Sequence, residues 1–172
     1  KEWIKAEALF EGVPENRFKF PEIVPVKAGE KIFLNYRKDL ALEAFDVRHS
    51  IPAMGGTLYR YKKKLKEEYL GKTPNEIIEL RKNNVDITRE VYDPIISFMG
   101  DCLGESLLQN RQVFKSKVLI TECTFVDNDD EEMSYKKGHT HLKHIVSALN
   151  ELDNQVECEK IILSHFSMKY SE

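Results

Sequence analysis

The feature that most restricts the fold is a set of short apolar runs, each followed or ended by a polar residue. Runs of four to eight residues rich in aliphatic, β-branched and aromatic side chains predict strands. Segments with helical spacing separate them, which predicts an α/β fold. With no repeat and no linker, we expect a single domain over residues 1–172. The polar-ended runs cover residues 42–49, 95–101, 117–122 and 160–166.

The remaining segments give a coarse map of elements. Thr73, Pro74 and Glu76 form a capping box with proline at the first helical position, so a helix is predicted over residues 73–82. Tyr61, Leu65 and Tyr69 are at helical spacing. Further strands are predicted over 31–36, 57–61 and 85–92, and further helices over 61–70, 105–111 and 141–152, with an acidic solvated loop over 127–132.

Composition excludes several classes of protein. The 172 residues are 41% hydrophobic and 32% charged with a net charge of −3, which fits a globular chain and gives no global sign of a nucleic-acid or membrane surface. Because a bilayer span needs about 18 consecutive apolar residues, we expect no membrane segment. Three widely spaced cysteines support no disulfide framework and indicate a reducing intracellular compartment. Cys102 and Cys123 are expected to be small buried fillers rather than nucleophiles.

Three polar residues at strand ends are candidates for a site. His49, Asp101 and His165 each follow an apolar run. Strand ends in α/β proteins meet loops, where sites are assembled. Imidazole nitrogen and carboxylate oxygen are ligands that Zn²⁺ accepts. The alternative is three unrelated polar residues at the ends of their strands.

Residues 139–144 contain a second histidine cluster, with the spacing H-x-H-x-x-H. Metallo-β-lactamase-type hydrolases use H-x-H-x-D-H, but Lys143 stands here in place of the aspartate. A protonated lysine cannot coordinate a metal. We therefore predict that His141 and His144 belong to the first turn of a helix and are not metal ligands.

Five segments in order resemble the motifs of RNase Z, the tRNA 3′-processing endonuclease branch of the metallo-β-lactamase superfamily. In chain order, the first resembles a strand that ends in a metal-binding histidine. The other four resemble the motifs "GDT", "EATF", "GHST" and "LTHFSxRY". The segments are FDVRHSIPAMGGTLYR (45–60), ISFMGDC (96–102), LITECTF (119–125), KKGHTHL (136–142) and LSHFSMKY (163–170). The resemblance implies a four-layer αββα sandwich of metallo-β-lactamase type, present here only in part.

The resemblance also implies residue roles. His49 would bind one zinc ion, Asp101 would bridge two, and His165 would bind the second. His139 would donate a proton to the leaving 3′ oxygen, and Glu122 would orient it. Two zinc ions per complete site would polarise the scissile phosphate and activate water, and histidine suits the acid because its side chain ordinarily titrates near neutrality.

Two departures from the family pattern keep alternatives open. The H-x-H-x-D-H motif belongs upstream of His49, and residues 1–48 contain no histidine. The chain is therefore predicted to be the C-terminal portion of a longer polypeptide and to supply only part of the metal ligands. The alternatives are a catalytically inert scaffold or RNA-binding domain, or another hydrolase of the superfamily.

The expected partner is precursor tRNA or another RNA, with a homodimer as a further option and no membrane. A run of basic residues could contact phosphates, or could be a solvated face. Because the interval between His49 and Asp101 is short and lacks a Gly-Pro signature, we expect no full RNA-gripping arm. The candidate RNA-binding residues are Arg60, Lys62, Lys63, Lys64 and Lys66.

Overall fold

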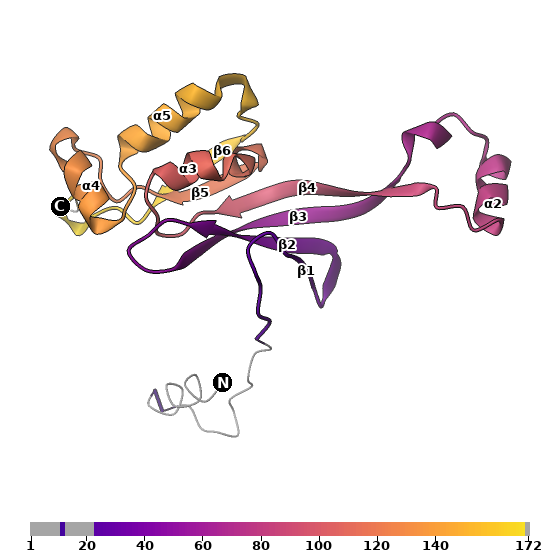
Figure 1. The fold of residues 1–172 in the computed structure, drawn as a ribbon, viewed down its shortest axis with the longest axis horizontal. Helices are drawn as coiled ribbons and strands as arrows, with labels where there is room; N and C mark the ends of the chain where they lie inside the picture. The colour runs from indigo at the N-terminus through magenta and orange to yellow at the C-terminus, as the bar shows by residue number, and fades with distance from the viewer. Residues whose placement is uncertain (1–10, 13–22, 171–172) are drawn as a thin grey trace.

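The structure is a computed structural model and describes residues 11–12 and 23–170. Its centre is one six-stranded sheet with the order β1-β2-β3-β4-β5-β6 (Figure 1). The strands are β1 (Lys31–Leu34), β2 (Arg37–Val47), β3 (Ala53–Leu65), β4 (Thr88–Phe98), β5 (Val118–Glu122) and β6 (Lys160–Ser164). The α-helices are α2 (Pro74–Lys82), α3 (Glu105–Gln109), α4 (Glu131–Lys137) and α5 (Leu142–Leu152). Short 3-10 turns are η2 (Glu67–Tyr69), η3 (Arg111–Lys115), η4 (Asn128–Asp130), η5 (Asp153–Gln155) and η6 (Met168–Tyr170).

The pairing of the strands determines where the site can lie. β1 to β4 form an antiparallel meander, whereas β4, β5 and β6 are parallel. Parallel neighbours need crossovers, which α3 and then α4 with α5 supply. The carboxyl ends of β4, β5 and β6 therefore meet at one edge of the sheet.

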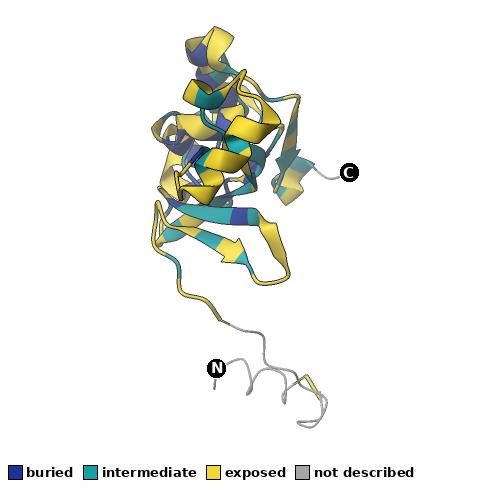
Figure 2. Cartoon of the chain, turned by 90° about the vertical axis from the view of Figure 1, so that its right-hand side faces the viewer, coloured by how far each residue is buried: buried dark blue, intermediate teal, exposed yellow. Residues whose placement is uncertain are grey.

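The core lies between one face of the sheet and the helices above it (Figures 1 and 2). Its buried side chains come from β2, β5, α3, η3 and α5, so both layers are needed to exclude water. The cluster consists of Phe45, Val47, Met99, Cys102, Leu107, Val113, Phe114, Leu119, Cys123, Ile145, Ala148 and Leu152. The predicted helix over 141–152 is confirmed, since Ile145, Ala148 and Leu152 of α5 are buried there.

The opposite face of the sheet carries exposed apolar side chains. Phe98, Ile120 and Ile162 are register partners across β4, β5 and β6, and Phe98 and Ile162 are 51% and 47% exposed. Leu119, on the other face of β5, is fully buried. The described residues thus build one sheet layer and one helix layer, which is half of a four-layer αββα sandwich and confirms the expectation of a partial fold.

The structure differs from the predicted elements in the region between β3 and β4. Residues 61–65 are not helical but continue β3, where Lys63 pairs with Glu90 and Leu65 with Thr88. Strand β4 runs through Pro94, and a register irregularity between Leu58 and Tyr59 accommodates that proline. Cross-strand pairing therefore overrides the helical spacing of the lysine-rich segment.

These two strands extend beyond the helix-covered sheet as a two-stranded ribbon (Figure 1). The helix α2 lies at its far end, and its predicted capping box is present: Thr73 Oγ1 accepts from Glu76 N, and Glu76 accepts from Thr73 N. We call the ribbon and α2 the arm. The expectation that the short interval excludes a full arm is corrected by this projection.

The acidic stretch is also more ordered than expected. Residues 131–137 form α4, which ends at Gly138 in the left-handed conformation. Glu131 and Glu132 lie in its first turn and Lys136 and Lys137 in its last, the arrangement that the helix dipole favours. Among the described residues, no helix is long and apolar enough to cross a membrane.

Candidate metal centre

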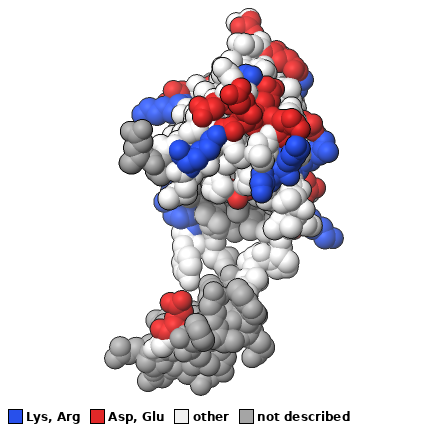
Figure 3. Space-filling view, turned by 90° about the vertical axis from the view of Figure 1, so that its left-hand side faces the viewer, with Lys and Arg blue, Asp and Glu red and all other residues white. Residues whose placement is uncertain are grey.

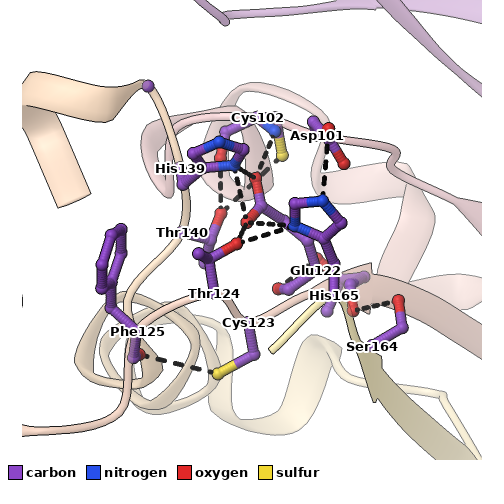
Figure 4. A network of polar contacts seen from close by, with 12 residues as sticks. Asp101, Cys102, Glu122, Cys123, Thr124, Phe125, His139, Thr140, Ser164 and His165 are labelled. Atoms are coloured by element: carbon purple, nitrogen blue, oxygen red, sulfur yellow. Dashed lines mark hydrogen bonds and ion pairs between the residues drawn. The ribbon is translucent and has the colours of Figure 1, made fainter. Parts of the chain in front are cut away.

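The candidate site lies at the edge where β4, β5 and β6 end (Figure 4). Asp101 follows β4 after Gly100, which has a φ of 67°, and Glu122 is the last residue of β5. His165 follows β6 with a φ of 58°, a left-handed conformation that is costly for a non-glycine residue. Strain of this kind persists where surrounding contacts enforce it, and it concentrates at functional sites.

Asp101, His139 and His165 form the one group, within the part of the chain that is described, whose ligand atoms all lie within 4.8 Å of one another. His165 Nε2 is 3.7 Å from Asp101 Oδ2, and the rings of His139 and His165 stack with centroids 5.2 Å apart. Donors bound at about 2.1 Å in a tetrahedral zinc site lie about 3.4 Å apart. The three side chains are therefore near one another but would have to move closer together to share one metal ion.

Glu122 is the buried hub beneath this group. Its side chain is 2% exposed. Its Oε1 accepts from Cys102 N at 2.6 Å and lies 3.0 Å from His139 Nδ1. A carboxylate only accepts, so His139 Nδ1 donates and the ring has a fixed orientation. The predicted contact between Glu122 and His139 is therefore present.

A further residue that the motif comparison had not singled out completes the network. Thr124 Oγ1 donates to Glu122 Oε2 and lies 2.9 Å from His165 Nδ1. Backbone bonds tie the same segments together, because Cys123 N donates to Ser164 O and Ser167 N donates to Thr124 O. The sequence signal for Thr124 was its place two residues after Glu122 at the end of a strand.

His49 lies beside this group and not within it. Its ring centroid is 5.1 Å from that of His139, and its Nδ1 donates to the carbonyl of Gly138 at 2.8 Å. Gly138 has a φ of 79°, and a Cβ there would lie 3.1 Å from His49 Nδ1. Because Nδ1 carries the hydrogen in this contact, the lone pair of the neutral ring is on Nε2, which is the nitrogen that could coordinate a metal. The structure brings Asp101 and His165 together with His139, while the assignment of His49 as a ligand stays a prediction.

The donor set fits a zinc ion. Nitrogen and oxygen donors converge at an open edge, and all three histidines have their Nδ1 engaged by a protein oxygen, as metal-ligating histidines usually do. A hollow of about 290 Å³ lies over this edge, with room for a ligand between the side chains. It is lined by Phe98, Gly100, Asp101, Glu122, Ser164 and His165.

The histidine-rich stretch behaves as predicted outside His139. His141 caps α5, where its Nδ1 accepts from Lys143 N, and His144 Nδ1 accepts from His141 N. Burial lowers the pKa of His144, and the positive field of His141 adds to this. Lys143 pairs with Glu131 at 2.8 Å. These residues therefore secure the start of a helix.

The basic residues proposed for RNA lie on β3 and its end, along the arm and apart from the metal group. Lys62 pairs with Asp93, and Lys66 lies 3.2 Å from Asp86. Arg60, Lys63 and Lys64 have no ion pair among the described residues.

The cysteines are unsuited to nucleophilic chemistry. Burial raises the pKa of the Cys102 thiol to about 12, despite its contact with Thr140, and raises the pKa of Cys123 to about 11. A thiol needs to ionise to react as a nucleophile. Both residues are free and buried, as fillers would be.

The end of the molecule that holds α4 carries many carboxylates, with lysine and arginine side chains around them (Figure 3). The acids are largely paired: Asp130 bonds to Lys169 and to Tyr170, and Glu132 lies 2.8 Å from Lys136. The pKa of Asp130 is lowered, first by its hydrogen bond to Lys169 and then by that to Tyr170. This face is a solvated, ion-paired surface, consistent with the expected role of the acidic run.

Comparison with known proteins assigns the family. No protein-family model matches the chain. It is 34% identical over 152 residues to tRNase Z TRZ2, chloroplastic, and 35% identical over 152 residues to tRNase Z TRZ1, both from Arabidopsis thaliana. Each match covers 87% of this chain, and 41% and 52% of the respective relative, so the chain spans about half the length of these proteins.

Among solved structures, yeast PDE1 matches 85% of this chain and 39% of its own with a TM-score of 0.50 at 13% identity. The metallo-β-lactamase fold protein YhfI from Bacillus subtilis matches 84% of this chain and 42% of its own, with a TM-score of 0.47 at 10% identity. The chain belongs to the RNase Z branch of the metallo-β-lactamase superfamily.

Proposed function

We propose that this chain is part of a zinc-dependent endoribonuclease that removes the 3′ trailer of precursor tRNA. The observation that carries the proposal is the His139–Glu122 pair, 3.0 Å between Nδ1 and Oε1, directly beside the Asp101–His165 pair. A positioned proton donor next to a metal-binding edge is what phosphodiester hydrolysis requires. The names of the Arabidopsis relatives, both tRNase Z, support the choice of substrate.

In this proposal His49, Asp101 and His165 would hold the metal, and the Asp101 carboxylate would be shared between two zinc ions. Bound zinc would polarise the phosphate and lower the pKa of a water molecule toward about 7. The remaining ligands would come from polypeptide outside these 172 residues or from a partner copy. A homodimer is one arrangement that would supply them.

His139 acts as the proton donor to the leaving 3′ oxygen. Its Nδ1–H is committed to Glu122, so its Nε2 faces outward and can hold the proton that is transferred. The ring is 19% exposed, enough to meet a substrate at the edge of the hollow. Glu122 keeps this orientation because it is buried and fixed by Cys102 N.

The arm supplies a separate contact to RNA. Arg60, Lys63 and Lys64 would meet phosphates of the tRNA body, a sequence-independent and salt-sensitive interaction. Lys62 and Lys66 would contribute less because each is already ion-paired. We place the protein in a reducing intracellular compartment, in keeping with its three free cysteines.

The test is cleavage of a precursor tRNA by the full-length protein, together with its zinc content. We expect about two zinc ions per complete site, and a loss of cleavage when Asp101→Ala removes the bridging carboxylate. Asp129→Ala, on the solvated acidic face, is the matched control and should cleave normally. Full cleavage by Asp101→Ala would refute the bridging role, and a full-length protein without zinc would refute the catalytic proposal.

The second candidate is a catalytically inert scaffold or RNA-binding domain of the same fold. Binding of precursor tRNA without cleavage, in a full-length protein that lacks zinc, would support this reading.

A further inference from the structure

The contacts of Thr124 join two parts of the site that have different proposed roles. Its hydroxyl donates to Glu122 Oε2, and the same oxygen is 2.9 Å from His165 Nδ1. Glu122 also accepts from His139 Nδ1. One buried carboxylate is therefore connected to two histidines: to His139 by a direct hydrogen bond, and to His165 through the Thr124 hydroxyl, with Glu122 Oε2 also 4.0 Å from His165 Nδ1 (Figure 4).

The direction of the hydrogen bonds follows from the donors available. A carboxylate has no hydrogen to give, and a threonine hydroxyl has one. That hydrogen goes to Glu122, with which Thr124 makes its closer contact. Thr124 can then only accept from His165, so Nδ1 of His165 must carry the hydrogen in its neutral form.

This arrangement sets the tautomer of His165. With hydrogen on Nδ1, the lone pair resides on Nε2, the atom that lies 3.7 Å from Asp101 Oδ2. The backbone of His165 holds a φ of 58°, so the side chain is fixed both at its root and at its ring. A metal-ligating histidine commonly donates its other nitrogen to an oxygen acceptor in this way.

We infer that Thr124 is a positioning residue that relays the charge of Glu122 to His165, and so presents His165 Nε2 to the metal. This inference rests on the proposed metal role of His165. It deepens the proposed function, because Glu122 would then orient both the proton donor, His139, and a metal ligand, His165. Thr124 is 7% exposed, which keeps water from replacing its hydroxyl.

The test uses Thr124→Val, which keeps the shape of the side chain and removes the hydroxyl, with Thr124→Ser as the conservative variant. Thr57→Val is the matched control, because Thr57 is 1% exposed and bonds to Ser97 Oγ, away from the site. Nitrogen-15 NMR of the histidine rings in the metal-free full-length protein reports the tautomer directly. Zinc affinity is measured separately by competition with a chromophoric chelator.

We expect His165 in the Nδ1–H form in the wild type, in Thr124→Ser and in Thr57→Val, with loss of that preference in Thr124→Val. Zinc affinity should fall about 10- to 100-fold in Thr124→Val alone, the range for lost outer-shell partners. An Nε2–H tautomer in the wild type, or an unchanged tautomer in Thr124→Val, would overturn the inference. If the wild type takes up no zinc, the proposed function fails, while the tautomer still decides the relay.

Discussion

Replacing Glu122 with glutamine tests the centre of the network, since the two side chains have the same shape. Glu122 accepts hydrogen bonds from Cys102 N, Thr124 and His139. An amide has one accepting oxygen. If that oxygen takes the place of Oε1, it keeps the bonds from Cys102 and His139, but the amide nitrogen then confronts the Thr124 hydroxyl.

The magnitude follows from these contacts. The opposite amide orientation places nitrogen 2.6 Å from Cys102 N, two donors in contact, so it is excluded. In the permitted orientation two charge-assisted bonds become neutral, each at a cost of about 1 kcal/mol, and Thr124 must turn its hydrogen toward His165. We expect Glu122→Gln to lower the free energy of unfolding by about 2 kcal/mol.

Urea denaturation measures this change, with an unchanged m-value as evidence that the folded state is the same. Cleavage of precursor tRNA should fall by about 10²–10³-fold, because the orientation of His139 is weakened. The matched control is Glu105→Gln, which removes an exposed partner of Arg48 and should cost less than about 1 kcal/mol. Glu122→Gln with stability equal to or above that of the wild type would refute the account of Glu122 as a satisfied buried anion.

Three further predictions concern the surroundings of the site. Gly138→Ala should lower the free energy of unfolding by about 1–2 kcal/mol, measured by thermal unfolding, because φ is 79° and the new Cβ would meet His49 Nδ1 at 3.1 Å. Gly71→Ala is the control, because Gly71 has a φ of 90° but open space around it, so it measures the backbone strain alone. Equal losses in the two variants would show that His49 is not displaced. Tyr170→Phe removes a hydroxyl that accepts from Val126 N at 3.0 Å and donates to Asp130. We expect the free energy of unfolding in urea to fall by about 1 kcal/mol. An unchanged value would show that these bonds do not stabilise the loop after β5. Burial raises the pKa of Cys102 to about 12 and that of Cys123 to about 11, above the ordinary 9.0. The stability that these thiols contribute is therefore present below pH 9 and falls as the pH rises toward 11–12. Both thiols should resist a thiol reagent at pH 8 until urea is added, and rapid labelling of the native protein would contradict their burial.

The sequence predicted the helices that are determined by neighbouring residues. The box formed by Thr73 and Glu76 starts α2, and the apolar stripe of α5 packs as its spacing indicates. The strand-end positions of Asp101, Glu122 and His165 also followed from the sequence, because parallel strands bring their ends to one edge.

Features set by distant partners were not predictable in this way. The lysine-rich residues 61–65 have helical spacing, but become a strand because residues 88–92 pair with them. His49 is oriented by Gly138, 89 positions away along the chain. The relay through Thr124 depends on a left-handed His165, a backbone conformation that no residue pattern signalled.

The arm has a mechanical consequence. From Tyr61 to Leu65 the ribbon advances about 14 Å at about 3.4 Å per residue, and over that length β4 is the one described strand that pairs with β3. A two-stranded ribbon is marginal by itself, so its amide hydrogens should exchange with solvent well before those of β5. Bending at its root would carry α2 through a wide arc while the edge that holds Asp101 and His165 stays still. The molecule thus has a flexible arm at one end and a rigid group of candidate metal ligands at the other.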